Sequence, residues 1–274
     1  MTQSRGNRLD VGLGALREQG RKALVTFITA GDPEPAVTVP ALHALVRGGA
    51  NVLELGVPFS DPEAEGPAIQ ASSERALRQG MTLRGCLGMV AAFREDDDTT
   101  PVVLMGYLNS VLAMGCERFA DAAADAGVDG LIMVNLPPEE AAELQQALAR
   151  RDIRLVYLVA PTTTESRARM ILRHAGGFVY YVSLKGITGA DHLDAPAVGE
   201  KLQWLRGLTE LPVMVGFGIK DGASARTVAA SADGAVVGSA LVRTMAAAAE
   251  TPERIPEQLE AQALEIRRAL DEPQ

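Results

Sequence analysis

A single carboxylate interrupts the apolar run that opens the stretch LELGVPFSDPEAEGP, residues 53–67. Glu54 stands between Leu53 and Leu55, so a strand here would carry it into an apolar environment. Burial disfavours the ionised form of a carboxyl group and raises its pKa, which suits proton transfer near neutral pH. The alternative is a structural glutamate paired with an arginine, a lysine or backbone donors. Spacing alone leaves both interpretations open.

The loop that follows offers three more carboxylates, Asp61, Glu63 and Glu65. Asp61 precedes a proline, an arrangement typical of turns in which the side chain accepts backbone N–H bonds. We expect Glu63 to be solvated. Glu65 comes just before the next helical segment, from which its side chain can project over the mouth of a barrel. The local pattern does not rank Glu65 above Asp61.

Two glycine-rich segments, VGFGIKDG (215–222) and VVGSALV (236–242), end neighbouring apolar runs near the end of the chain. Glycine lets a backbone approach a ligand closely, and a helix that starts just afterwards offers free N–H groups to a phosphate. The candidate phosphate ligands are Gly218, Gly238 and Ser239, with Gly189 added by the segment SLKGITGAD (183–191). The alternative is that these glycines only permit tight turns. The pattern indicates a phosphate-bearing substrate without specifying the reaction.

The elements that must position these groups alternate between strand and helix. We predict strands at residues 23–29, 51–56, 101–107, 129–135, 154–160, 177–183, 211–218 and 233–240. Helical segments are expected at residues 8–19, 35–48, 67–79, 82–94, 116–126, 165–174, 195–206, 221–230 and 252–270, and after the prolines at 137–138. Continuous apolar strands separated by helices are typical of a parallel sheet covered on both faces.

Eight such units in 274 residues predict an α/β fold of the TIM barrel type, (β/α)8, as one domain over residues 1–274. The open doubly wound sheet is the alternative. Residues 8–19 are expected to form an extra N-terminal helix that caps the bottom of the barrel. In this fold the active site lies at the C-terminal ends of the strands.

Composition excludes several other classes of protein. The net charge of −9 argues against non-specific binding to nucleic acid or to anionic membranes. No apolar run approaches the length of a membrane span, and residues 1–16 lack the apolar core of a secretion signal, so we expect a cytoplasmic protein. Cys86 and Cys116 lack metal-ligand spacing and are expected to be free buried thiols. We see no Ser-His-Asp arrangement and no metal cluster.

The stretch LELGVPFSDPEAEGPAIQ (53–70) closely resembles the signature of the tryptophan synthase α subunit family. The resemblance continues through FITAGDP (27–33), PVVLMGYLN (101–109), the SLKGITGA loop, GFGI and GSAL, and it covers nearly the whole chain in order. It implies a (β/α)8 barrel that cleaves indole-3-glycerol phosphate to indole and glyceraldehyde 3-phosphate by a retro-aldol reaction. It implies no organic cofactor and no metal. Such subunits usually work in an α2β2 complex, where indole passes to a pyridoxal-phosphate (PLP)-dependent β subunit.

The resemblance also assigns catalytic roles. The family's first catalytic carboxylate matches Glu54, which would protonate indole C3 and then take a proton from the adjacent substrate hydroxyl as the C–C bond breaks. The second matches Glu65, which would accept the indole N–H bond as positive character develops there. The family normally has Asp at this second position. One extra methylene moves a carboxylate by about 1 Å, a displacement that can cost on the order of 10²-fold in rate.

Two other departures fall on loops around the expected site. Asn135 stands where the family usually has an Asp associated with loop positioning and subunit communication. Leu184 stands where the best-known members have Arg, while Thr188 remains able to bond the second carboxylate over a closed loop. These departures suggest altered coupling to a β subunit.

By motif match, the expected indole pocket is apolar and aromatic. Its members are Phe27, Ile69, Met105, Leu158, Tyr180 and Phe217, the last beside the phosphate-binding Gly218. Tyr107 and Tyr180 have polar tips that can reach the substrate or neighbouring loops. Three alternatives to an α subunit remain: a stand-alone indole-producing lyase of a specialised pathway, a weakly active activator of a β subunit, and another sugar-phosphate enzyme such as an isomerase.

Overall fold

The computed structural model describes residues 6–182, 195–216 and 218–272. Within them eight parallel strands close into a barrel, in the order in which they occur along the chain, which confirms the predicted (β/α)8 fold. The strands are β1 (Ala23–Thr29), β2 (Val52–Gly56), β3 (Val102–Gly106), β4 (Gly130–Met133), β5 (Arg154–Val159), β6 (Val179–Val182), β7 (Val213–Gly216) and β8 (Gly234–Val237). Several are shorter than the apolar runs predicted, because buried apolar residues continue past the last paired residue into the loops.

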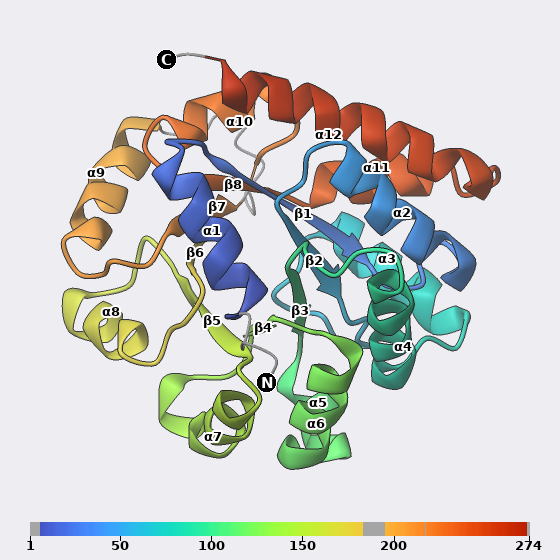
Figure 1. Cartoon of the computed structure of the whole chain (residues 1–274), viewed down its shortest axis with the longest axis horizontal. Helices are drawn as coiled ribbons and strands as arrows, with labels where there is room; N and C mark the ends of the chain where they lie inside the picture. Colours follow the sequence, from blue (N-terminus) through green and yellow to red (C-terminus); the bar gives the residue numbers. More distant parts are fainter. Residues whose placement is uncertain (1–5, 183–194, 217, 273–274) are drawn as a thin grey trace.

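A ring of helices surrounds the barrel, and Figure 1 looks down its axis. The helices are α1 (Arg8–Glu18), α2 (Pro35–Arg47), α3 (Pro67–Arg78), α4 (Leu83–Arg94), α5 (Leu108–Met114), α6 (Cys116–Ala126), α7 (Ala142–Arg150), α8 (Glu165–Leu172), α9 (Ala195–Arg206), α10 (Gly222–Ala229), α11 (Ser239–Ala247) and α12 (Ile255–Asp271). The short helix α5 was not predicted. Gly115, with φ of 91°, separates it from α6, so two helices follow β3 instead of one.

Alternate residues of each strand enter two different apolar cores. Leu53 and Leu55 of β2 face outward and pack with the helices, whereas Val52 faces the barrel interior. Because side chains alternate across a strand, Glu54 faces the interior as well. The parity of β2 therefore aims this carboxylate into the barrel.

Helix α1 closes the N-terminal end of the barrel, as the sequence predicted, and lies across the centre of Figure 1. Leu9, Leu13 and Leu16 are buried there against the inward-facing residues of the strands. The side chain of Asn7 caps the N-terminus of α1 by accepting the Leu9 N–H (2.9 Å), and it ties the helix to the sheet by donating to the carbonyl of Asp129 (2.9 Å). The opposite, C-terminal end is left for the site.

A recurrent polar bond fixes the N-terminal edge of the sheet. The residue that precedes each of β2, β4 and β8 accepts a backbone N–H from the odd-numbered strand beside it. The pairs are Asn51 with Leu24 (2.9 Å), Asp129 with Val102 (2.8 Å) and Asp233 with Val213 (2.8 Å). Asp129 is 3% exposed and also pairs with Arg94 and Arg8, at 2.8 Å each. These side chains extend the ladder where its backbone partners end.

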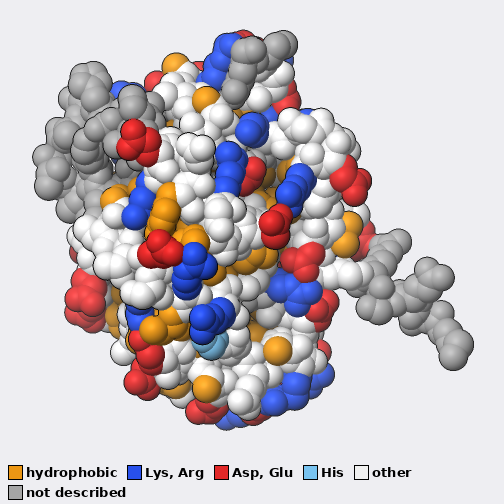
Figure 2. Space-filling model, turned by 90° about the vertical axis from the view of Figure 1, so that its left-hand side faces the viewer, with side chains coloured by type: hydrophobic (Ala, Val, Ile, Leu, Met, Phe, Trp, Pro, Cys, Tyr) orange, Lys and Arg blue, Asp and Glu red, His pale blue; other side chains and the backbone are white. Residues whose placement is uncertain are grey.

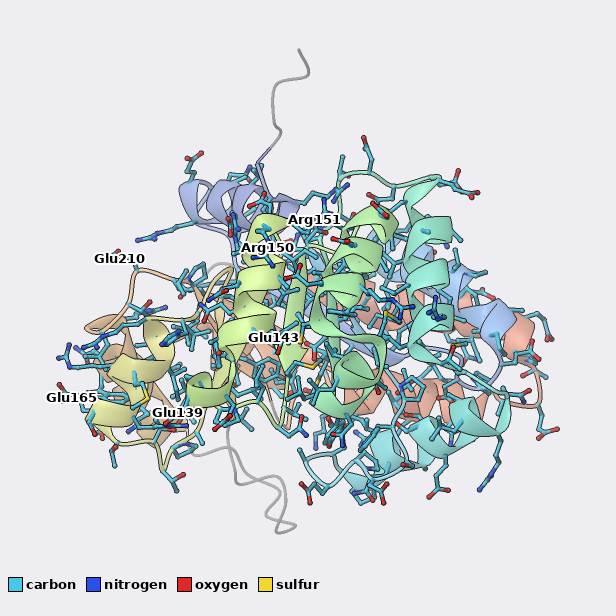
Figure 3. All side chains as sticks on the ribbon, turned by 90° about the horizontal axis from the view of Figure 1, so that it is seen from below. Glu139, Glu143, Arg150, Arg151, Glu165 and Glu210 are labelled. Atoms are coloured by element: carbon cyan, nitrogen blue, oxygen red, sulfur yellow. The ribbon has the colours of Figure 1, made fainter. Side chains whose placement is uncertain are left out.

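Ion pairs join neighbouring helices over the surface. Arg150 and Arg151 at one end of α7, both labelled in Figure 3, pair with Glu117 and Asp121 of α6. Acidic and basic side chains are interspersed on the side of the molecule seen in Figure 2. Within the described residues, we find no helix with the length and apolar character required to cross a membrane. Cys86 and Cys116 are buried free thiols, as predicted.

Candidate active site

Glu54 lies inside the C-terminal half of the barrel and is 1% exposed. Its neighbours in register are Phe27 of β1 and Val103 of β3, both apolar. Neither carboxylate oxygen has a hydrogen-bond partner among the described residues, so the alternative of a paired structural glutamate finds no support in them. Burial, reinforced by the charge of Glu65, raises the pKa of Glu54 to about 8. At neutral pH the group is therefore protonated and can donate a proton.

The three loop carboxylates occupy different environments. Asp61 and Glu63 are exposed, and Asp61 accepts a bond from the Ser60 hydroxyl (2.6 Å). Glu65 is half-buried and lines a cleft at the barrel mouth. Burial raises the pKa of Glu65 to about 7, close enough to neutrality for both of its forms to be populated. Of the three, Glu65 is the carboxylate whose charge raises the pKa of Glu54.

The cleft brings together residues from the first three strand–loop units. Its walls include five of the residues expected at the site: Phe27, Glu65, Ile69, Met105 and Tyr107. The walls are largely apolar and aromatic, and the free space between them is about 10 Å³, so a ligand ring enters only if wall side chains move. Leu158 of β5 pairs in register with Tyr180 of β6, and both pack against the barrel interior.

Two glycines make room for the aromatic rings of this mouth. A Cβ at Gly56 would lie 2.6 Å from Cζ of Phe27, and a Cβ at Gly216 would lie 2.2 Å from the hydroxyl oxygen of Tyr180. Only glycine allows so close an approach. Burial and the charges of Glu54 and Glu65 hold the pKa of Tyr180 well above its ordinary value, so its phenol stays protonated. The sequence analysis missed both glycines, although each is the last residue of its strand.

Helix α3 is clamped to the end of β1 by two polar contacts that the sequence analysis also missed. The Thr29 and Ser72 hydroxyls lie 2.6 Å apart. Arg75 donates to both oxygens of the fully buried Asp32, at 2.6 and 3.0 Å. The loop that carries Glu65 therefore runs into a helix whose position is fixed.

The two helices expected to bind phosphate begin differently. Asp221 caps α10 by accepting the Ser224 N–H (2.8 Å), which occupies a donor and places a negative charge at that N-terminus. The prediction that both helices offer free N–H groups to a phosphate therefore holds only in part for α10, because one of these groups is already bonded to Asp221. Helix α11 begins at Ser239 after Gly238, and no side chain caps it. Its first N–H groups and helix dipole suit an anion.

The remaining expected phosphate and loop residues are placed as follows. Gly218 has φ of 75°, a left-handed conformation that favours glycine. Gly238 lies against Phe27, because a Cβ there would be 3.3 Å from the Phe27 Cβ. Thr188, Gly189, Leu184 and Phe217 lie outside the described residues.

Asn135 joins the loops that follow β4 and β3. Its Oδ1 accepts the Leu108 N–H (2.8 Å) at the start of α5, and its amide donates to Asn109 (3.2 Å). The acceptor role can be filled equally by an aspartate, whereas the donated bond needs an amide. This side chain thus ties two loops of the barrel mouth together.

Comparisons with known proteins agree with the geometry. A family model described as "Tryptophan synthase alpha chain" matches residues 13–271. The chain is 55% identical over 265 residues to the tryptophan synthase alpha chain of Alkalilimnicola ehrlichii, covering 97% of each chain. It is 56% identical over 251 residues to that of Chromobacterium violaceum, covering 92% of this chain and 95% of the relative.

Solved structures give the same result. The alpha subunit from Legionella pneumophila superposes with a TM-score of 0.91 at 43% identity, over 97% of this chain and 98% of the other. A tryptophan synthase structure from Mycobacterium tuberculosis superposes with a TM-score of 0.88 at 34% identity, over 98% of this chain and 100% of the other.

Proposed function

Because the chain belongs to the tryptophan synthase alpha chain family, we propose that it cleaves indole-3-glycerol phosphate to indole and glyceraldehyde 3-phosphate in tryptophan biosynthesis. The observation that carries this proposal is the buried carboxyl of Glu54, which has no hydrogen-bond partner among the described residues and whose pKa is raised by a second carboxylate, Glu65, in an apolar mouth. A retro-aldol cleavage at an indole ring needs one proton donor inside the site and one acceptor at the ring nitrogen.

Glu54 supplies the proton. Since the pKa of Glu54 is raised to about 8, the group enters the reaction protonated at neutral pH. Transfer of this proton to indole C3 gives an indolenine, which can accept the electron pair of the C–C bond. The carboxylate of Glu54 then takes the proton of the adjacent substrate hydroxyl as that bond breaks. Indole and the aldehyde leave, and Glu54 is protonated again.

Glu65 acts at the ring nitrogen. In its ionised form it accepts the indole N–H bond and stabilises the positive character that develops in the indolenine. The apolar walls of the cleft lower the local dielectric around Glu65, which strengthens this interaction. The buried Phe27 and the partly buried Met105 provide apolar surface beside Glu65.

The phosphate is assigned to the N-terminus of α11. Gly238 and Ser239 supply backbone donors there, and the Ser239 hydroxyl can add one more. Gly218, Gly189 and Phe217 are proposed to complete this side of the site. The indole ring is assigned to the cleft, with Ile69, Leu158 and Tyr180 around it and Thr188 available to bond Glu65.

A β subunit is the proposed partner. The family's alpha chains imply such a partner, and we propose an α2β2 assembly with a PLP-dependent β subunit, in the cytoplasm. Asn135 ties together two loops of the mouth, so a changed residue at this position bears on how the subunits communicate. A stand-alone lyase is the second candidate, because Glu65, Asn135 and Leu184 depart from the family's usual residues on the loops around the site.

One assay separates these possibilities. The purified protein is incubated with indole-3-glycerol phosphate, alone and with a tryptophan synthase β subunit, and indole release is measured. A subunit of a complex releases indole slowly alone and faster with the partner, whereas a stand-alone lyase is equally fast in both. Absence of indole under both conditions would refute the lyase. Glu65→Ala serves as the site variant, and full activity in it would remove Glu65 from the mechanism.

A further inference from the structure

The loop between β2 and α3, which carries Glu65, is anchored at both of its ends. At its start, the Val57 N–H donates to the Met105 carbonyl of β3 (2.7 Å). At its end, Pro67 begins helix α3, which is clamped to β1. Between these points the loop has exposed residues, including Asp61 and Glu63. The position of Glu65 therefore depends on further contacts between these two ends.

Three bonds surround the backbone of Glu65. The N–H of the preceding residue, Ala64, donates to the hydroxyl oxygen of Tyr107 (3.0 Å). The Glu65 N–H donates to the Pro62 carbonyl (3.0 Å), which closes a turn. The Glu65 carbonyl accepts a bond from Nε2 of Gln70 (2.8 Å). Two of the three partners are thus side chains from other elements.

Tyr107 is itself held rigidly. It is 5% exposed, and its ring stacks on Phe59, with centroids 4.8 Å apart and planes inclined by 17°. Burial raises the pKa of Tyr107 to about 12, and the charges of Glu65 and Glu63 raise it as well. The phenol thus stays neutral at physiological pH. Its oxygen accepts the bond from the loop, and its own O–H remains able to donate.

We propose that Tyr107 and Gln70 are positioning residues that hold the 62–66 turn so that the Glu65 carboxylate faces the barrel mouth. This inference rests on the proposed function and, of the two contacts expected for the Tyr107 hydroxyl, substrate or neighbouring loop, builds on the second. A glutamate has one more rotatable bond than an aspartate, so its carboxylate can explore more space. A fixed backbone narrows that space. Holding the turn in place keeps the Glu65 carboxylate in its position. This matters because a shift of about 1 Å can cost on the order of 10²-fold in rate.

Tyr107→Phe tests the proposal, because it keeps the stacked ring and removes only the acceptor. Tyr157→Phe is the matched control: Tyr157 is a buried tyrosine of β5 on the outer face of the barrel, and its hydroxyl has no partner among the described residues. We expect Tyr107→Phe to lower kcat for indole release about 10-fold, the factor expected for one lost hydrogen bond of about 1.4 kcal/mol, with KM nearly unchanged. The control should retain parental kcat and KM.

The pKa of Glu65 is a second measurement, and a general loss of stability without a change at Glu65 would leave this pKa unchanged. A turn freed from Tyr107 exposes Glu65 to water, so its pKa should fall from about 7 towards the ordinary value of 4.5. Carbon-13 NMR of protein labelled at glutamate carboxyl groups measures this directly, with Glu65→Gln assigning the signal. We expect a fall of about one unit or more in Tyr107→Phe, a change in the same direction in Gln70→Met, and none in Tyr157→Phe.

The two measurements also separate this inference from the proposed function. If the parent releases no indole but the Glu65 signal shifts in Tyr107→Phe, the lyase assignment fails and the clamp stands. If the parent releases indole and neither kcat nor the Glu65 titration changes in Tyr107→Phe, the clamp is refuted and the lyase stands.

Discussion

The buried carboxyl of Glu54 should make the protein less stable as pH rises, and Glu54→Gln should remove that loss. In the folded chain the pKa of Glu54 is about 8, compared with its ordinary value of 4.5. Between these values the unfolded chain releases the proton while the folded chain retains it, so rising pH favours unfolding. The contribution is fully present below about 4.5, and it is lost progressively until the folded carboxyl also ionises near 8.

The size of the effect follows from the two pKa values. One pKa unit corresponds to about 1.4 kcal/mol, so the gap between 4.5 and about 8 amounts to about 5 kcal/mol as an upper bound. Glutamine has nearly the same shape, but it is neutral at every pH. The free energy of unfolding of Glu54→Gln should therefore exceed that of the parent by an amount that grows from about 1 kcal/mol near pH 5 to several kcal/mol at pH 9.

Urea unfolding followed by far-ultraviolet circular dichroism at one-unit intervals from pH 5 to pH 9 measures this difference. Glu65 titrates in both proteins, so its contribution largely cancels. Glu63→Gln is the matched control, because it removes an exposed carboxylate from the loop next to the site. Its curve should run parallel to that of the parent. If the Glu54→Gln curve also runs parallel to the parent's, then Glu54 is not a buried carboxyl held protonated, and the reasoning fails.

Two further substitutions test the N-terminal edge of the sheet and the barrel mouth. Asp129→Ala leaves the nearly buried guanidinium of Arg94 without its carboxylate, so the free energy of unfolding should fall by about 3–5 kcal/mol in a urea titration; a loss below about 1 kcal/mol would contradict the role given to this pair. Gly216→Ala forces the ring of Tyr180 to move, since the new Cβ would lie 2.4 Å from its Cε1. It should lower kcat/KM for indole release by at least about 10-fold while the fold persists by circular dichroism, and parental kinetics would show that Tyr180 does not shape the mouth.

The sequence predicted the barrel because its strands and helices carry local signals. The apolar runs recur eight times with helices between them, and eight such units in 274 residues favour a closed barrel over an open doubly wound sheet. Strand ends were placed too far out because apolar side chains such as Leu211 remain half-buried beyond the paired residues. Helix α5 was missed because it is short and only Gly115 separates it from α6.

The site was predictable only in part, for a physical reason. The inward orientation of Glu54 follows from its alternation with Leu53 and Leu55, which is local. The choice between Asp61 and Glu65 is not local. It depends on Tyr107, which lies 43 residues away in sequence from the backbone that it holds. No pattern within the loop itself records that contact, so the resemblance to a family had to supply the choice.

The central claim is that Glu54 donates the proton that starts cleavage of indole-3-glycerol phosphate. Its most direct test is the rate of indole release by Glu54→Gln compared with the parent, at saturating substrate and pH 7. Glutamine preserves the shape of the side chain and cannot give up a proton, so we expect kcat to fall by at least about 100-fold with little change in KM. A variant that releases indole at the parental rate would contradict the account.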